Sequence, residues 1–441
     1  MGRIADREIT IGVVGLGYVG LPTALLFFES GYRVIGIDSC NSVVSLLKEG
    51  KNPIGDSEFD DKIPPRQEKN WIITSSYSDS IKLCDVVIVT VPTPVTSDKD
   101  LDERNVLGAG ESIFQNIPQK SGKIIVLEST VYPGFTRKIW SPIVLENGLI
   151  LGEDVHIAYC PERYNPGDKH STIAKTTRIV GSMSDEVGEF LASLYSSISE
   201  VDVIHVGSME VAESSKLIEN VQRDINIALV NELSMILPSL GIDIEEVLDA
   251  ASTKWNFHRY FPGIGVGGHC IPVDPYFLID QANEKNNAVQ LISTARLIND
   301  QMPKHVSDLI VEIMRSHNLS FSESSILVMG WSYKPNIGDI RGSPSLDLAR
   351  ILSDLGIAIS VLDPFVPKKD LPDFVKVVDD IDQIKGFDMI VMATAHDFFQ
   401  GINWGDILSK MSNNIIFDGR RCLDLEELRQ LGWSVYALGK P

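Results

Sequence analysis

Short apolar runs that end abruptly in small, polar or proline-containing sequence recur through the first third of the chain. EITIGVVG and YRVIGID flank a helical pattern, LPTALLFFESG, so strand, helix and strand alternate from the start. Three further runs follow, at CDVVIVTVPTP (84–94), GKIIVLEST (122–130) and DVHIAYCPER (154–163). Apolar strands that alternate with helices predict an open parallel sheet.

The middle of the chain changes to one long helical pattern between residues 208 and 241, which closes on proline and glycine. Strand and helix patterns then resume with SSILVMG, SLDLARILSDLG, IAISVLDPF, FDMIVMATAHDFF and NNIIFDGRRCLD. We therefore predict an α/β protein with two Rossmann-like, doubly wound parallel-sheet domains, at 1–203 and 319–441, joined by a central helical region at 204–318. The central helix is apolar on more than one side, which makes it the natural seam of a homodimer.

Composition narrows the class of protein without naming a function. The 441 residues are 44% hydrophobic and 22% charged, as in ordinary globular proteins. A net charge of −21 argues against nucleic acid or an anionic membrane surface as a partner. The start has no signal-peptide pattern, and no apolar run approaches the roughly 18 residues that span a bilayer, so a cytoplasmic protein is expected. The five cysteines are scattered singly, which predicts a reducing compartment and no metal site.

A glycine motif follows the first strand. Gly15, Gly17 and Gly20 form GxGxxG before a helix, and Asp38 ends the next strand. In this setting the glycines let the turn approach a pyrophosphate at the helix N-terminus, and the carboxylate accepts the ribose hydroxyls. The motif GLGYVG therefore predicts an NAD site that includes Tyr18 and Val19, with NADP disfavoured because Asp38 repels a 2′-phosphate. The alternative is a tight turn that binds no ligand.

Polar residues also follow the later strands of this half. In an open parallel sheet, ligands bind beyond the carboxyl ends of the strands. Thr93, Thr130 and Glu162 are therefore expected along one rim, over the nicotinamide half of the cofactor. A capping or buried role is the alternative for each of them.

Two features of the middle region carry candidate chemistry. Lys216 and Asn220 lie four residues apart on the long helix, so they point the same way and could stabilise an oxyanion. A solvated lysine is the plain alternative. The stretch GVGGHCIPVDP (265–275) holds one cysteine among glycines and prolines that exclude regular structure. Cys270 is accordingly either an inert thiol or a nucleophile.

Cations gather in the loops of the last third. GWSYKPNIGDIRGSPS, which follows a strand, carries Lys334 and Arg341, and Arg420 and Arg421 follow another strand. Cations above strand ends suggest a second anionic ligand, such as a diphosphate.

Taken in order, several motifs resemble the UDP-glucose/GDP-mannose dehydrogenase family over nearly the whole chain. They are GLGYVGLP, TVPTP, EST, CPERYNPGD, Lys216-x-x-x-Asn220, GVGGHCIPVDP, SYKPNIGDIRGSPS and FDGRRCLD. VGGHCIPVDPY and PERYNPGDK are similar to the branch that oxidises UDP-N-acetylhexosamines. Family members that act on UDP-glucose usually carry a lysine three residues after the cysteine, where this chain has Val273.

The resemblance implies a four-electron oxidation of C6 of a UDP-N-acetylhexosamine, with two NAD reduced in turn and a thiohemiacetal and a thioester formed on Cys270. By similarity, Lys216 and Asn220 stabilise oxyanions, Asp274 with Thr130 holds a water, and Glu162 assists hydrolysis of the thioester. The resemblance also implies that Lys334 and Arg421 contact the nucleotide and that Arg341 contacts the cofactor. Gly267 is implied to contact the substrate, and Arg259 the substrate of a neighbouring subunit. His269 is read as a substrate-shaping or structural residue.

Three other functions stay open at this point. A UDP-glucose 6-dehydrogenase differs only in pocket contacts, as do enzymes for the gluco, galacto and manno epimers. A single-hydride dehydrogenase of the hydroxyacid type also carries Lys-x-x-x-Asn, but it needs neither Cys270 nor the last domain. A catalytically silent NAD sensor needs only the fold.

Overall fold

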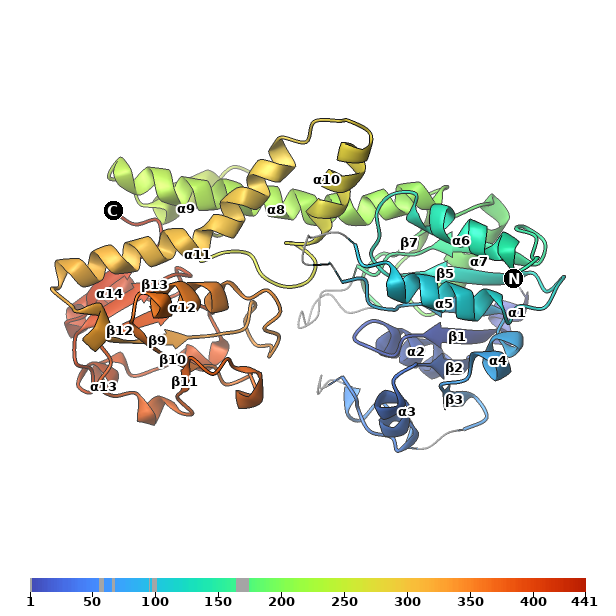
Figure 1. The fold of residues 1–441 in the computed structure, drawn as a ribbon, viewed down its shortest axis with the longest axis horizontal. Coiled ribbons are helices and arrows are strands. Elements are labelled where there is room, and N and C mark those ends of the chain that lie inside the picture. The colour runs from blue at the N-terminus through green and yellow to red at the C-terminus, as the bar shows by residue number, and fades with distance from the viewer. Residues whose placement is uncertain (1, 55–58, 66–67, 95, 97–100, 164–173) are drawn as a thin grey trace. The chain divides into compact units, whose positions relative to one another are not determined.

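The computed structural model describes residues 2–54, 59–65, 68–94, 96, 101–163 and 174–441. The chain divides into two compact units, each with its own sheet (Figure 1). Unit 1 comprises Met1–Glu219 with Tyr276–Gln281, and unit 2 comprises Asn220–Pro275 with Ala282–Pro441. The predicted central segment is shared between them, because helices α8 (Met209–Ser239) and α10 (Asp274–Glu284) each contribute residues to both units.

Within the described residues, the sheet of unit 1 has eight strands in the order β3-β2-β1-β4-β5-β6-β7-β8. All neighbours pair in parallel except β6 and β7. The first six strands follow the doubly wound order, with the switch point between β1 and β4. The strands are β1 (Thr10–Val14), β2 (Arg33–Ile37), β3 (Trp71–Thr74), β4 (Val86–Val89), β5 (Lys123–Leu127), β6 (Val155–Tyr159), β7 (Ile179–Ser182) and β8 (Ile204–His205).

Helices cover this sheet, which explains why β1, β4 and β5 are apolar at nearly every position rather than at alternate ones. The helices are α1 (Gly2–Ala5), α2 (Gly20–Glu29), α3 (Asn41–Lys48), α4 (Tyr77–Ser80), α5 (Arg104–Phe114), α6 (Phe135–Glu146) and α7 (Asp185–Ser196). The five strands expected from the apolar runs are confirmed, whereas β3, β7 and β8 were not predicted.

The sheet of unit 2 repeats the same winding. In the described residues it has six parallel strands in the order β11-β10-β9-β12-β13-β14. The strands are β9 (Ser325–Met329), β10 (Ala358–Leu362), β11 (Lys376–Val377), β12 (Met389–Met392), β13 (Ile415–Asp418) and β14 (Ser434–Ala437). The helices are α9 (Ile244–Ser252), α11 (Leu291–Ser316), α12 (Pro344–Asp354), α13 (Trp404–Leu408) and α14 (Leu425–Leu431). The predicted fold class, with two doubly wound parallel sheets, is confirmed.

Successive side chains of a strand point to opposite faces of the sheet, so alternate residues of the unit 2 strands belong to two separate cores. Ile326 and Val328 of β9 join the core that includes α11 and α12, whereas Leu327 and Met329 join the core that includes α13 and α14. Because both faces of the sheet are buried, polar side chains reach the surface at the strand ends.

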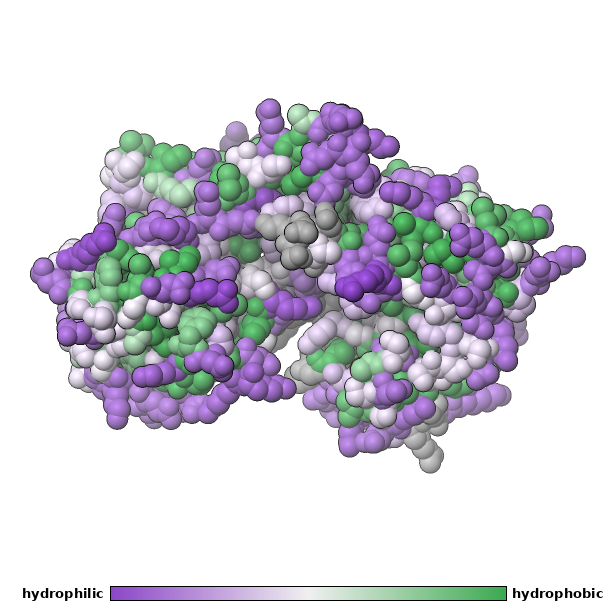
Figure 2. Space-filling model, in the orientation of Figure 1, coloured by the Kyte–Doolittle hydropathy of each residue, from purple (hydrophilic) through white to green (hydrophobic). Residues whose placement is uncertain are grey.

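No helix within the described ranges is long and apolar enough to cross a lipid bilayer. On the face drawn in Figure 2, hydrophilic residues are widespread and apolar residues form smaller patches between them.

Candidate active site

The structure brings the predicted cofactor residues of unit 1 to one edge of its sheet. Strands β2, β1, β4, β5 and β6 are parallel neighbours, so their carboxyl ends lie along the same edge. Within four residues of these ends come Asp38, Gly15, Thr93, Thr130 and Glu162. This is the edge at which open parallel sheets bind ligands.

The three glycines of the first turn serve different purposes. Gly15 has a left-handed φ of 90°, and Thr90 Oγ1 donates a hydrogen bond of 2.7 Å to its carbonyl oxygen. A Cβ on Gly20 would lie 1.8 Å from that same oxygen, so the fold itself requires both glycines. A Cβ on Gly17, by contrast, would have no described atom within 4 Å. The open side of Gly17 suits the close approach of a ligand.

The surroundings of this turn fit a dinucleotide. The Asp38 carboxylate accepts hydrogen bonds of 2.8 Å from the backbone N–H groups of Leu16 and Cys40. A carboxylate has about four acceptor positions, so it keeps capacity for ribose hydroxyls. Helix α2 starts after Val19, and no described side chain caps it, so its first N–H groups suit a pyrophosphate. Tyr18 lies exposed beside this helix start.

Replacing Gly17 with alanine tests whether its open side is the cofactor site. We expect Gly17→Ala to keep the melting temperature of the wild type and to weaken NAD by at least about tenfold, or about 1.4 kcal/mol. Gly20→Ala is the matched control, and its Cβ clash predicts a lower melting temperature. Calorimetric titration with NAD measures the first effect, and an unchanged NAD affinity in Gly17→Ala would place the cofactor elsewhere.

A buried ionic cluster holds Glu162. Nη2 of Arg178 lies 3.3 Å from Oε2 of Glu162, and its Nη1 lies 3.0 Å from Oε1 of Glu128, which also accepts a hydrogen bond of 2.7 Å from the Tyr195 hydroxyl. Burial alone would lower the pKa of Arg178, but the two carboxylates raise it, so the guanidinium stays charged. Arg178 therefore fixes the carboxylate of Glu162 at the sheet edge. The rest of the motif around Glu162, residues 164–169, lies outside the described residues.

The sequence did not identify Thr90, Glu128 or Arg178. Thr90 and Glu128 follow directly after buried strands, and this position at a strand end is the feature of the sequence that could have identified them. Arg178 lies 16 residues beyond Glu162 in the chain and gave no comparable signal. Among the described residues, no group of three or more His, Cys, Asp or Glu side chains could hold a metal ion.

In unit 2, Cys270 lies one turn before helix α10. Its carbonyl oxygen accepts hydrogen bonds from the backbone N–H groups of Val273 (3.0 Å) and Asp274 (2.8 Å). Asp274, at 2% exposure, accepts a hydrogen bond of 2.5 Å from Nδ2 of Asn220. The half-buried Cys270 thus belongs to a turn that leads directly to a buried carboxylate and its amide partner. Lys216 is half-buried on α8, one turn before Asn220, and belongs to unit 1.

The glycines of the cysteine loop pack against the loop at residues 331–344. A Cβ on Gly267 would lie 2.6 Å from Cβ of Tyr333 and 2.7 Å from the carbonyl oxygen of Gly342. Gly268 has a φ of 91°, and its N–H donates to the carbonyl oxygen of Arg341 (2.9 Å). Burial raises the pKa of Tyr333 to about 12. The glycines therefore allow two loops to meet, a purpose that the sequence did not indicate.

The predicted cations of unit 2 lie in different surroundings. Arg341 is exposed and pairs with Asp339 (2.5 Å), while Arg259 pairs with Glu245 and Asp249. The guanidinium of Arg421 is buried in an ion pair with Asp243 (2.8 Å). The side chain of Arg420 points toward Gly263, near the start of the cysteine loop. A Cβ added to Gly263 would lie 2.3 Å from Nη1 of Arg420.

The side chains of Arg420 and Arg421 point in different directions because of the backbone conformation. Arg421 has a left-handed φ of 54°, so successive side chains do not follow the alternation of a strand. The nucleotide contact implied for Arg421 stays a prediction, as do the roles of Arg259, Arg341 and Lys334. His269 is exposed beside Cys270, and its role is likewise untested.

Comparisons with known proteins give one family for nearly the whole length of the chain. Three models of the UDP-glucose/GDP-mannose dehydrogenase family match in order: the NAD binding domain at 9–199, the central domain at 210–301 and the UDP binding domain at 327–425. The predicted NAD cofactor is thereby confirmed.

Two relatives are similar over almost their full length. The UDP-N-acetyl-D-glucosamine 6-dehydrogenase of Pseudomonas aeruginosa is 35% identical, over 95% of this chain and 98% of that relative. The UDP-N-acetyl-D-mannosamine dehydrogenase of Pyrococcus horikoshii is 34% identical, over 94% of this chain and 96% of that relative. A solved structure of UDP-D-ManNAc dehydrogenase from Pyrococcus horikoshii superimposes with a TM-score of 0.87 at 31% identity, covering 98% of this chain and 99% of the other.

Proposed function

Because this chain belongs to the UDP-glucose/GDP-mannose dehydrogenase family of NAD-dependent oxidoreductases, we propose that it oxidises C6 of a UDP-N-acetylhexosamine to the carboxylate. The observation that carries this proposal is the grouping of the Cys270 loop, buried Asp274 and Asn220 at the start of helix α10. A nucleophilic thiol is needed to oxidise an alcohol to an acid through a thioester. It is not needed for a single oxidation of an alcohol to a carbonyl compound.

The thiol accounts for the second half of the oxidation. NAD held by unit 1 would supply the hydride acceptor for each of the two oxidations. Between them, the thiolate of Cys270 adds to C6 of the aldehyde to form a thiohemiacetal, which retains the sugar on the enzyme. Loss of the second hydride leaves a thioester, and water then attacks its carbonyl carbon, releasing the uronate and restoring the thiol. Cys270 lies in the turn that leads into the N-terminus of α10.

Other residues of the chain would serve these steps. Asn220 donates to Asp274 through Nδ2, so the buried carboxylate is oriented before substrate arrives. We assign Asp274 with Thr130 to holding a water, Lys216 with Asn220 to stabilising the oxyanions, and Glu162 to removing a proton from the hydrolytic water. Arg178 supports the last role, because its guanidinium holds the carboxylate of Glu162 in place.

The N-acetylated substrate is favoured by position 273 and by the relatives. Val273 stands where family members that act on UDP-glucose usually carry lysine, and both relatives described above are named for N-acetylhexosamine nucleotides. UDP-glucose is the second candidate. A single-hydride hydroxyacid dehydrogenase is disfavoured, because residues 327–425 match a UDP binding domain.

Initial rates with four nucleotide sugars test the substrate. We expect kcat/KM for UDP-N-acetylglucosamine, or for its galacto or manno epimer, to exceed that for UDP-glucose by about 100-fold, since a pocket shaped for the acetamido group gains little from the smaller sugar. Faster turnover of UDP-glucose would instead support the second candidate.

An apolar stripe on α8 supports a homodimer. Val211 and Ile218 are seven residues apart, as are Leu229 and Ile236, and each is between 47% and 58% exposed. Seven-residue spacing keeps apolar side chains on one side of a helix, as in helices that pair with a partner helix. A second copy of this chain would bury the stripe along α8.

Leu229→Glu is expected to make the protein monomeric at micromolar concentration, because a dimer would bury an unpaired carboxylate. Leu355→Glu, at an exposed leucine outside α8, is the control and should remain dimeric. Sedimentation velocity measures both, and a dimeric Leu229→Glu would contradict this interface.

A further inference from the structure

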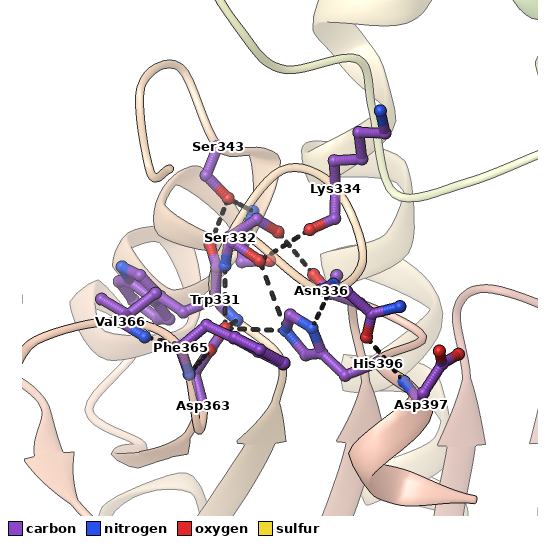
Figure 3. Close-up of polar contacts among 12 residues, drawn as sticks. Trp331, Ser332, Lys334, Asn336, Ser343, Asp363, Phe365, Val366, His396 and Asp397 are labelled. Atoms are coloured by element: carbon purple, nitrogen blue, oxygen red, sulfur yellow. Dashed lines mark hydrogen bonds and ion pairs between the residues drawn. The ribbon is translucent and has the colours of Figure 1, made fainter. Parts of the chain in front are cut away.

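A polar cluster is buried beneath the loop at residues 331–343, at the carboxyl ends of β9, β10 and β12 (Figure 3). His396 lies at its centre and is 1% exposed. Its Nδ1 lies 2.8 Å from the backbone nitrogen of Asn336, and its Nε2 lies 3.0 Å from Asp363 Oδ2 and 3.3 Å from Ser332 Oγ. The histidine therefore connects strand ends to the middle of the loop that carries Lys334.

These contacts determine the form of the imidazole. A backbone N–H can only donate, so Nδ1 of His396 is the acceptor and carries no proton. Nε2 therefore carries the proton and donates to the carboxylate of Asp363. The neutral ring contacts Asn336 through Nδ1, and Asp363 and Ser332 through Nε2, so loss of each nitrogen breaks a different set of contacts.

Asp363 anchors the beginning of the loop. Its Oδ2 accepts from the N–H groups of Trp331 (2.6 Å) and Ser332 (3.0 Å), and its Oδ1 accepts from Phe365 (2.9 Å) and Val366 (3.2 Å). Asp363 follows β10 as Asp38 follows β2, in sheets of the same strand order. The Asp363 carboxylate thus accepts from four N–H groups and from His396, and its side chain is 1% exposed. It has no capacity left to accept from a ribose. The carboxylate fixes the loop instead of a ligand.

His396 then fixes the turn at Asn336. That residue has a left-handed φ of 63°, a conformation that asparagine tolerates but that costs free energy without supporting contacts. Its N–H donates to His396, and its Oδ1 accepts from the N–H of Asp397 (2.9 Å), so residues 396 and 397 hold the turn from two sides. The loop conformation thus depends on β12 and the turn that follows it.

The fixed loop presents two side chains of interest. Lys334 precedes Asn336 by two residues, and its carbonyl oxygen accepts from the Ser332 hydroxyl (3.0 Å), while its side chain points away from the buried cluster (Figure 3). Tyr333 packs against Gly267 and Gly268 of the cysteine loop. A displaced turn at Asn336 would move the lysine and the support of the cysteine loop together.

We propose that His396 is a positioning residue for the nucleotide half of the substrate: it holds the 332–336 turn in the one conformation that aims Lys334 at the phosphates. The inference rests on the proposed function, because it takes Lys334 as a phosphate contact. His396 itself touches neither substrate nor cofactor.

Two substitutions separate the two nitrogens of the ring. His396→Gln keeps a donor near the place of Nε2 but has no acceptor for Asn336, whereas His396→Asn keeps an acceptor near the place of Nδ1. Calorimetric titration of the full chain with UDP should show about tenfold weaker binding for His396→Gln and recovery of most of the affinity in His396→Asn. NAD affinity should change less than twofold in both. His317→Asn is the control, because it removes another histidine contact in unit 2, with the Tyr436 hydroxyl (2.9 Å).

A double variant tests whether His396 acts through Lys334. If it does, Lys334→Met with His396→Gln binds UDP no more weakly than Lys334→Met alone. Three results would overturn the role of His396 but not the proposed nucleotide site. They are additive losses of UDP affinity in the double variant, equal losses in His396→Gln and His396→Asn, and unchanged UDP affinity in His396→Gln. A wild type that does not bind UDP, or a Lys334→Met variant that binds it normally, would overturn the proposed nucleotide site and this inference with it.

Discussion

Cys270→Ala is expected to make no uronate, a loss on the order of 10³-fold or more in acid formation, while NAD binding stays near that of the wild type. Without the thiolate, the aldehyde formed at C6 has no covalent attachment and no route to a thioester. We expect NAD binding to persist because the matched NAD binding domain, residues 9–199, belongs to unit 1, whereas Cys270 belongs to unit 2. Mass spectrometry of the sugar product and calorimetric titration with NAD measure the two quantities.

A cysteine without this role provides the control. Cys422→Ala removes the other cysteine of the same unit and should leave the rate of acid formation unchanged. Uronate formed by Cys270→Ala at the wild-type rate would exclude the covalent mechanism.

Arg178→Met should destabilise the protein by about 3 to 5 kcal/mol, because it leaves a buried carboxylate without its counter-charge. The side chain of Glu128 is 0% exposed and that of Arg178 is 2% exposed, so water cannot replace the lost partner. Burial already raises the pKa of Glu128 despite the guanidinium. Urea denaturation followed by circular dichroism measures the change in free energy of unfolding.

Another arginine of unit 1 offers a matched comparison. Arg137 forms an ion pair of 2.7 Å with Glu210, and both side chains are at least 35% exposed. Arg137→Met should cost at most about 1 kcal/mol, since exposed pairs contribute little. Similar losses in the two variants would show that burial does not set the importance of Arg178.

The fold was predictable because its strongest signals are local. Strands β1, β2, β4, β5 and β6, buried on both faces, leave continuous apolar runs in the sequence, and their ends mark where Asp38 and Glu162 emerge. Strand β8 has only two residues and leaves no comparable run, whereas the runs WII of β3 and IV of β7 were not singled out. The division of α8 between two compact units depends on contacts between distant segments, which no local pattern records.

The candidate site was predictable where chemistry is tied to a motif. The glycine turn and the Cys270 loop are of this kind. Arg178 and His396 were not identified, because each is important through partners far away in sequence: Glu128 for the first, and Asn336 and Asp363 for the second. Gly267 was expected to contact the substrate, and the structure adds that Gly267 and Gly268 make room for Tyr333.

The most direct test of the central claim is the number of NADH molecules formed per sugar consumed. A limiting amount of UDP-N-acetylglucosamine, or of its galacto or manno epimer, is converted to completion with excess NAD, and absorbance gives the NADH formed. The proposed four-electron oxidation predicts two NADH per sugar with at least one of the epimers. One NADH per sugar would contradict it and identify a simple alcohol dehydrogenase in which Cys270 has no covalent role.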